Sequence, residues 1–143
     1  RDALRLEAGL CLYGQDLSKD VTPVEASLTW VISKRRREEG NFPGFKIINE
    51  QLVNGIKKCR VGISPFGKAP ARAGCEIFVN GGRKIGSITS GGYSPTLERP
   101  IAMGYVEEAF SKIGTEVLLS VRGKYLPAKV VDLPFVSPKY FRK

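Results

Sequence analysis

The sequence predicts an α+β protein that is mainly β, in which helical segments up to residue 54 are followed by a small antiparallel β-barrel. Three observations support this fold class. Apolar residues recur at helical spacing before Gly55. After Gly55, short runs of alternating or β-branched residues indicate strands. Turn residues separate six of these runs at regular intervals, as in small barrels, and 143 residues suffice to bury such a core.

The first predicted helix covers residues 1–14. Asp2 is expected to be its N-cap, because a carboxylate there accepts hydrogen bonds from the free amides of the first turn. Gly14 is expected to end it. Two adjacent rows of apolar residues follow the helical repeat: Leu4, Ala8 and Cys11, and beside them Leu6, Leu10 and Tyr13. We therefore expect most of this helix to be buried.

After a polar connector, residues 22–25 carry the pattern of a capping box, with Thr22 at the N-cap and Glu25 at N3. This pattern predicts a short helical turn. Residues 28–33 are β-branched and aromatic, which predicts a strand. Trp30, the single tryptophan, is expected to be a core anchor; the alternative is a stacking platform that lines a pocket.

The chain is basic, with 23 Lys and Arg residues against 14 Asp and Glu, for a net charge of +9. Such a surface favours anionic cofactors or acidic protein partners. No zinc-finger or RNP-like aromatic motif is present, so nucleic acid is not the expected partner. The densest basic run is 34–37, which we interpret as a solvated loop; the alternative is a docking patch for an acidic partner.

A second amphipathic helix is predicted over residues 45–53, ending at Gly55. We place a domain boundary there, so that residues 1–54 and 55–143 form separate units. The second unit is predicted to contain six strands, over 60–64, 75–79, 84–89, 101–106, 115–122 and 125–133. Turns are expected at 80–82, 91–95 and 123–124, and a helical turn over 107–112.

Several classes of catalytic site are excluded by composition. There is no histidine, which removes a Ser-His-Asp or Cys-His arrangement and most zinc sites. The three cysteines are an odd number with no close pair, so reduced thiols in an intracellular compartment are expected. The acidic residues form no tight cluster that predicts a metal site, and no apolar run reaches membrane-spanning length.

Blocks of sequence distributed over the whole chain identify a family more specifically than any single motif. They are RDALRLEAGLCLYGQDL, TPVEASLTW, KRRREEGNFPG, KKCRVGI, IGSITSGGYSPTLERPIAMGYV and PAKVVDLPFVSPKYF. In order and spacing they resemble the aminomethyltransferase of the glycine cleavage system, the T-protein family. The resemblance implies that residues 1–54 are the end of a central α+β folate-binding domain, and that 55–143 form a C-terminal barrel.

The resemblance also implies an activity. Members of the family take an aminomethyl unit from the lipoyl arm of a small acidic carrier protein, release ammonia and form 5,10-methylenetetrahydrofolate from tetrahydrofolate. Tetrahydrofolate is then the co-substrate, no metal is needed, and the carrier protein is the partner. The compartment would be the bacterial cytoplasm or the mitochondrial matrix, without a membrane partner.

By the same resemblance, Arg1 and Tyr140 are expected to contact folate, Trp30 is a further candidate, and Arg60 has a structural role. Arg1 and Tyr140 lie at opposite ends of the sequence, so they meet only if the C-terminal tail returns to the first helix. The catalytic aspartate of the family lies in an N-terminal part that this chain does not contain. We therefore expect no catalytic residue here, and no activity from this chain alone.

Two other functions stay open. The basic charge is compatible with a folate-family relative that acts as a binding or RNA-modification helper. A related folate-dependent demethylase, or the folate-binding portion of an enzyme that oxidises dimethylglycine, is the other alternative. The RLEAGLCLYG and KRRR blocks favour the glycine cleavage member.

Overall fold

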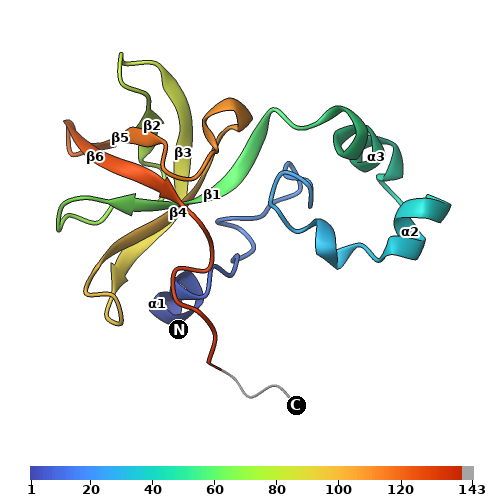
Figure 1. Cartoon of the computed structure of the whole chain (residues 1–143), viewed down its shortest axis with the longest axis horizontal. Coiled ribbons are helices and arrows are strands. Elements are labelled where there is room, and N and C mark those ends of the chain that lie inside the picture. Colours follow the sequence, from blue (N-terminus) through green and yellow to red (C-terminus); the bar gives the residue numbers. More distant parts are fainter. Residues whose placement is uncertain (140–143) are drawn as a thin grey trace.

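A closed antiparallel barrel dominates the computed structural model, which describes residues 1–139 (Figure 1). Its strands are β1 (Lys58–Pro65), β2 (Glu76–Phe78), β3 (Lys84–Ser94), β4 (Arg99–Glu107), β5 (Glu116–Val121) and β6 (Lys124–Val131). They follow the order β1-β4-β3-β2-β5-β6, and β6 pairs with β1 to close the barrel. The predicted fold class is confirmed, because each run of alternating residues forms a strand and the glycine turns join neighbours.

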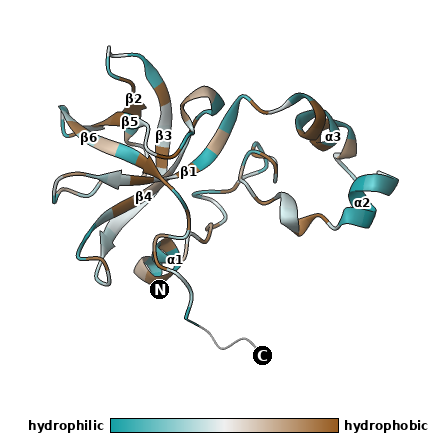
Figure 2. Cartoon of the chain, in the orientation of Figure 1, coloured by the Kyte–Doolittle hydropathy of each residue, from teal (hydrophilic) through white to brown (hydrophobic). Residues whose placement is uncertain are grey.

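The residues before the barrel contain α1 (Asp2–Glu7), the 3₁₀ turn η1 (Thr29–Val31), α2 (Lys34–Glu39) and α3 (Phe45–Asn54). A second 3₁₀ turn, η2 (Glu108–Phe110), follows β4. α2 and α3 project away from the barrel (Figure 1), and α2 is hydrophilic throughout its length (Figure 2). In residues 1–139, no helix has the length and apolar composition needed to cross a lipid bilayer.

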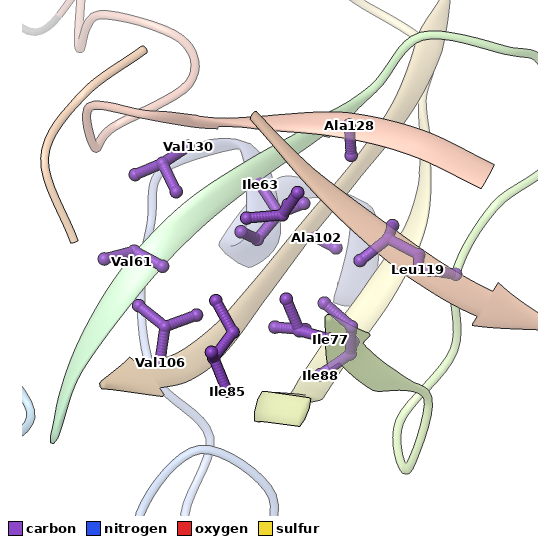
Figure 3. Close-up of a cluster of buried hydrophobic side chains, with 12 residues drawn as sticks. Val61, Ile63, Ile77, Ile85, Ile88, Ala102, Val106, Leu119, Ala128 and Val130 are labelled. Carbon is purple, nitrogen blue, oxygen red and sulfur yellow. The ribbon is translucent and has the colours of Figure 1, made fainter. Parts of the chain in front are cut away.

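The barrel interior is filled by apolar side chains, as Figure 3 shows. Each strand contributes at least one side chain that is almost completely buried: Ile63, Ile77, Ile88, Val106, Leu119 and Val130. These branched residues interdigitate, as expected for a small barrel whose lumen is just wide enough for side chains. A ligand site must therefore lie outside the barrel interior.

The prediction of a buried helix over 1–14 is wrong in extent. α1 ends at Glu7, and Gly9 adopts a left-handed conformation (φ 69°) that turns the chain well before Gly14. The N-cap is Arg1, without a side-chain capping bond, and Asp2 accepts a hydrogen bond from Arg5 instead. Much of the predicted apolar surface is consequently exposed: Leu4, Leu10 and Tyr13.

Residues 28–33 do not form the predicted strand, and Trp30 is not a core anchor. Thr29–Val31 form η1 instead, and Trp30 is 77% exposed. The next segment is also different, since the basic run forms α2 rather than a loop. The cause is Ser33, which caps α2 by accepting a hydrogen bond from the backbone N–H of Arg36 at 3.3 Å.

The predicted turn over 91–95 is wrong as well, because β3 continues to Ser94. Gly91 lies inside the strand for a reason of space: a Cβ atom built there would be 1.7 Å from the carbonyl oxygen of Ala71. The turn follows at 95–98, with Glu98 in the left-handed region (φ 53°). Gly91 therefore marks a close approach of two backbones.

Other local predictions are confirmed. The capping box forms, since the Thr22 N–H donates to Glu25 Oε1 at 3.1 Å and the Glu25 N–H donates to Thr22 Oγ1 at 3.2 Å. α3 matches the predicted second helix, and Gly55 follows it with a positive φ. The hairpin between β2 and β3 also forms where the Asn80-Gly81-Gly82 turn predicts it.

Candidate functional site

The first helix and the C-terminal tail meet on the outside of the barrel. Leu6 of α1 packs with Ile101 and Met103 of β4, and Leu133 and Phe135 of the tail cover this cluster. The backbone N–H of Val136 donates to the carbonyl oxygen of Glu7 at 3.0 Å. Figure 1 shows the tail passing beside α1. The expected return of the tail to the first helix therefore occurs, at least as far as residue 136.

A buried ion pair attaches α1 to the connector that follows it. Arg5 Nη1 lies 3.0 Å from Asp16 Oδ2, and the Asp16 side chain is fully buried. The same guanidinium donates to Gln15 Oε1 at 2.9 Å, to Ser90 Oγ at 3.1 Å and to the exposed Asp2 Oδ1 at 2.8 Å. Arg5 is therefore held on several sides, which fixes the orientation of α1 on the barrel.

The Asp16 carboxylate also accepts hydrogen bonds from two consecutive residues of β3. Thr89 Oγ1 donates to Oδ1 at 2.6 Å, and Ser90 Oγ donates to Oδ2 at 2.8 Å. Successive side chains of a regular strand point to opposite faces. Here the register of β3 against β4 shifts between Ile88 and Ser90, and this bulge aims both hydroxyls at one carboxylate. The Asp16 carbonyl oxygen accepts from the Tyr105 hydroxyl at 2.7 Å, so the connector is fixed by its backbone too.

Glu7 makes a second polar attachment between α1 and the barrel. Its carboxylate accepts hydrogen bonds from Ser94 Oγ at 2.6 Å, from the Thr96 N–H at 3.1 Å and from Thr96 Oγ1 at 3.0 Å. The bond from Ser94, followed by that from the Thr96 N–H, lowers the pKa of Glu7 below its usual value. The helix is therefore anchored at Arg5 on one side and at Glu7 on the other.

Arg60 has the structural role expected of it. Its Nε donates to the Ala26 carbonyl at 2.9 Å, and its Nη1 donates to the Gly9 carbonyl at 3.0 Å and contacts Met103 Sδ at 3.1 Å. It is buried in β1 and forms no ion pair with any described residue. One side chain thus ties two loops of the segment before the barrel to the barrel wall.

Two cavities flank α1. A cleft of about 460 Å³ is lined by Arg5, Arg72, Ser90 and Tyr93, among others. Arg72 donates only to the Gly91 carbonyl in the part of the chain that the structure describes, so its guanidinium is available to an anionic or carbonyl ligand. A larger groove of about 510 Å³, at the other end of α1, is mostly apolar. Its exposed apolar side chains are Leu10, Trp30 and Ile113.

The residues predicted to bind folate are not gathered in one cavity. Arg1 is exposed at the start of α1, and it lines neither cavity beside the helix. Trp30 lies in the apolar groove, and Tyr140 lies outside the described residues. Sequence reasoning missed Asp16 and Glu7. For Glu7 a signal existed, because its charge interrupts an apolar segment. For Asp16 the strand partners Thr89 and Ser90 are more than 70 residues away.

The thiols and acidic groups offer little reactive chemistry in residues 1–139. Cys11, Cys59 and Cys75 form no disulfide, and burial raises the pKa of all three. The Cys75 thiol donates to the Ser120 carbonyl at 2.7 Å. Within this described part, no group of three or more His, Cys, Asp or Glu side chains is placed to hold a metal ion.

Comparison with known proteins decides the family. The model of the glycine cleavage T-protein C-terminal barrel domain matches residues 58–137. The chain belongs to this family. The match begins with the first residue of β1 and continues into the tail that returns to α1. The T-protein barrel therefore includes the segment that carries Leu133 and Phe135.

The similarity to individual relatives in the T-protein family extends beyond the barrel to nearly the whole chain. The mitochondrial aminomethyltransferase of Dictyostelium discoideum is 55% identical over 142 residues, which cover 98% of this chain and 35% of the relative. That of Pisum sativum is 51% identical, with 99% and 35% covered. The crystal structure of the glycine cleavage system aminomethyltransferase T from Bartonella henselae superimposes with a TM-score of 0.94 at 48% identity, over 99% of this chain and 39% of that one. The chain thus spans about a third of the length of its relatives.

Proposed function

We propose that this chain is the C-terminal part of an aminomethyltransferase of glycine cleavage. The observation that carries the proposal is the match to named aminomethyltransferases across 98–99% of the chain. In the proposed reaction an aminomethyl unit arrives on the lipoyl arm of an acidic carrier protein, ammonia leaves, and 5,10-methylenetetrahydrofolate forms. Residues 1–54 would complete the central folate-binding domain and residues 55–143 the barrel, and the catalytic carboxylate would lie in polypeptide outside this chain.

The proposed role of α1 is to present Arg1 to folate. The anchors at Arg5 and Glu7 hold the helix rigidly on the barrel. Arg1 is exposed and forms no ion pair with any residue from 1 to 139, so its planar guanidinium suits a carboxylate or carbonyl of the folate. Tyr140 is assigned the second contact, because Val136, four residues earlier, is bonded to α1. Tetrahydrofolate supplies the nitrogen atoms that accept the one-carbon unit.

Trp30 is the third proposed folate contact. Its indole is exposed, and an exposed aromatic ring of this size is suited to stacking on a pterin or aminobenzoate ring. Trp30 lines the apolar groove and Arg1 does not, so both contacts require a folate that extends beyond this groove.

An acidic carrier protein is the proposed partner. The net charge of +9 attracts an acidic partner over a distance of about one Debye length. The four consecutive basic side chains 34–37 on α2 are exposed to solvent and are able to take part in this attraction. The relatives from Dictyostelium discoideum and Pisum sativum are named as mitochondrial, so the proposed compartment is the mitochondrial matrix, with the bacterial cytoplasm as the alternative.

A chimera tests the proposal with a complete enzyme. In it, this chain replaces the matched residues of the Dictyostelium discoideum aminomethyltransferase, which is 55% identical. The chimera is expected to form 5,10-methylenetetrahydrofolate from the loaded carrier protein, and the 143-residue chain alone is not. In calorimetry, Arg1→Ala is expected to weaken tetrahydrofolate binding by roughly tenfold or more, because a charge-assisted hydrogen bond is lost. Arg35→Ala, on exposed α2, is the control and should leave binding unchanged.

Failure of the chimera to make the product would contradict the proposal. Tight, salt-sensitive binding of tRNA in place of folate would instead support an RNA-modification helper. Trp30→Phe and Tyr140→Phe, measured in the same titration, test their two contacts separately. An unchanged affinity in either variant would remove that residue from the folate site.

A further inference from the structure

Most of the positive charge of the chain lies on the barrel and its tail rather than on the segment before them. Residues 1–57 contain nine Lys and Arg against eight Asp and Glu, whereas residues 58–143 contain fourteen against six. The basic run of α2 is partly offset, because Lys34 Nζ lies 3.8 Å from Glu38 Oε1 and Glu39 follows. The field that attracts an acidic partner therefore originates chiefly from the second part of the chain.

α1 and the C-terminal tail cover one side of the barrel. α1 packs against β3 and β4, and the tail joins it there through Leu133 and Phe135. In the closed order β1-β4-β3-β2-β5-β6, β5 lies opposite β4, and β6 lies opposite β3. Figure 1 shows β5 and β6 on the side of the barrel farther from α2 and α3. A protein that reaches the proposed folate site beside α1 therefore leaves the outer surface of β5 and β6 free.

This outer surface carries apolar side chains. Phe78 of β2, Leu118 of β5 and Pro127 of β6 are successive partners in register, so their side chains stand beside one another. The residues next to Leu118 in β5 point into the barrel core, so this row faces outward. Tyr125 packs edge-to-face on Phe78, with 5.3 Å between the ring centroids, and is 59% exposed. These four residues form what we call the outer apolar patch.

Cations without ion-pair partners border the outer apolar patch. Lys124 and Lys129 belong to β6, Arg122 belongs to the turn before it, and all three are exposed. None of them forms an ion pair with any residue from 1 to 139. The acidic side chains of β2 and β5 are Glu76, which is already in an ion pair at 3.3 Å, and Glu116, which is opposite Lys129 in register. The rim is therefore basic on balance, and an apolar centre with a charged rim is typical of a protein-binding surface.

We propose that the outer apolar patch and its basic rim bind an acidic protein other than the lipoyl carrier. The partner places apolar or aromatic side chains against Leu118 and Tyr125, and its carboxylates meet Lys124, Lys129 and Arg122. Because the proposed folate site lies beside α1, on the opposite side of the barrel, the complete enzyme can hold both proteins at once. Only this separation of the two partners rests on the proposed function, since the patch and its charges belong to the chain whatever reaction it serves.

Two other occupants fit this surface less well. Single-stranded nucleic acid binds through aromatic rings that stack on its bases, and Leu118 and Pro127 at the centre of the patch have no such ring. In a two-fold contact between two copies of the chain, the same basic rims would face one another, which like charges oppose. An acidic protein satisfies the apolar centre and the basic rim together.

Peptide display on the complete enzyme tests the proposal. Short random peptides are selected on the chimera with the Dictyostelium discoideum aminomethyltransferase. The tightest peptides are expected to carry Asp and Glu around one or more apolar residues. Hydrogen exchange of the chimera with such a peptide should slow in β5 and β6 and stay unchanged in β4. Recovery of no peptide, of peptides without an excess of acidic residues, or of peptides that protect α1 instead would overturn the proposal.

Variants of the chimera test the individual residues. Tyr125→Ser is expected to weaken binding of the tightest peptide by about tenfold or more, because an aromatic anchor is lost. Lys129→Gln, an exposed change that does not depend on the packing of Tyr125, should weaken binding by about threefold and reduce its sensitivity to salt. Tyr13→Ser and Lys46→Gln are the matched controls, since both residues are exposed outside the patch. Equal effects in patch and control variants would contradict the assignment.

Competition with the carrier protein distinguishes this proposal from the proposed function. The peptide should stay bound at a saturating concentration of the loaded carrier, and the chimera should form 5,10-methylenetetrahydrofolate at the same rate with the peptide bound. Displacement by the carrier would mean that the patch is the docking surface of the carrier itself, which would overturn the proposal. A chimera that lacks transferase activity but binds the peptide at β5 and β6 would contradict the proposed function and support the binding surface.

Discussion

Arg5 and Asp16 form a buried ion pair, 3.0 Å from Nη1 to Oδ2, that joins the first helix to the connector after it. The pair is embedded in hydrogen bonds from Ser90 and Thr89, on a bulged strand more than 70 residues away in the sequence. Four donors converge on this carboxylate, including the Leu12 N–H. Such a site is strongly coupled, because every donor loses its acceptor if the carboxylate is removed.

Asp16→Ala is therefore expected to lower the free energy of unfolding by about 3–5 kcal/mol, because Arg5 loses its buried partner and the Thr89, Ser90 and Leu12 donors lose their acceptor. Asp2→Ala is the matched control, because Asp2 contacts the same guanidinium at 2.8 Å but is 76% exposed. That variant should lose less than about 1 kcal/mol. Urea unfolding of both variants measures the difference. Equal losses would show that burial does not determine the strength of these two pairs.

Glu7 predicts a specific pH dependence of stability. The hydrogen bonds from Ser94 and Thr96 hold its folded pKa below the unfolded value of 4.5. The resulting stabilisation is present above the unfolded pKa, and it is lost as the pH falls through the folded pKa. Glu7→Gln should therefore be less stable than the parent at neutral pH, and this difference should shrink on acidification. Urea midpoints from about pH 7 to about pH 3 test this; a difference that is constant with pH would contradict it.

Two adjacent glycines of β3 should respond differently to the same substitution. A Cβ atom at Gly91 would be 1.7 Å from the Ala71 carbonyl oxygen, whereas the nearest atom at Gly92 is 3.7 Å away. Gly91→Ala is expected to cost at least about 3 kcal/mol because the two backbones must separate. Gly92→Ala should change stability by less than about 1 kcal/mol. Thermal unfolding of the two variants tests this difference. Similar melting temperatures would mean that the loop carrying Ala71 moves away from the new methyl group at little cost.

Arg60→Lys is expected to destabilise the chain by about 1.5–3 kcal/mol, although the charge is kept, because a lysine does not reproduce the planar fork. The two carbonyl partners, those of Gly9 and Ala26, lie in separate loops. Hydrogen exchange should therefore accelerate in both loops, while β5 stays protected. Loss of protection in β5 as well would show that Arg60 stabilises the whole barrel rather than these two contacts.

The barrel was predictable because its signals are local. Alternating side chains and the Asn80-Gly81-Gly82 turn specify a hairpin without reference to the rest of the chain. α3 and the capping box at Thr22 are local in the same sense. The structure of the residues before the barrel was harder to predict. Their apolar positions match a long helix, but α1 ends at Glu7 and Gly9 then turns the chain.

The candidate site depended on contacts that no local pattern encodes. The Glu7 carboxylate meets Ser94 and Thr96 across 87 and 89 positions of sequence. Asp16 finds Thr89 and Ser90 only because β3 is bulged. The sequence therefore indicated that α1 was important, through its block of residues, but not which of its side chains attach it to the barrel.

Closure of the barrel between β1 and β6 has a consequence for synthesis of the chain. The seam joins the first strand to the last, with Ile63 opposite Val130, so the barrel cannot close before residue 131 has left the ribosome. Until then β1 and β5 each present an unpaired edge, and exposed strand edges recruit other chains. Contacts this distant in sequence also form slowly. The nascent protein therefore depends on protection from aggregation until translation has passed its final strand.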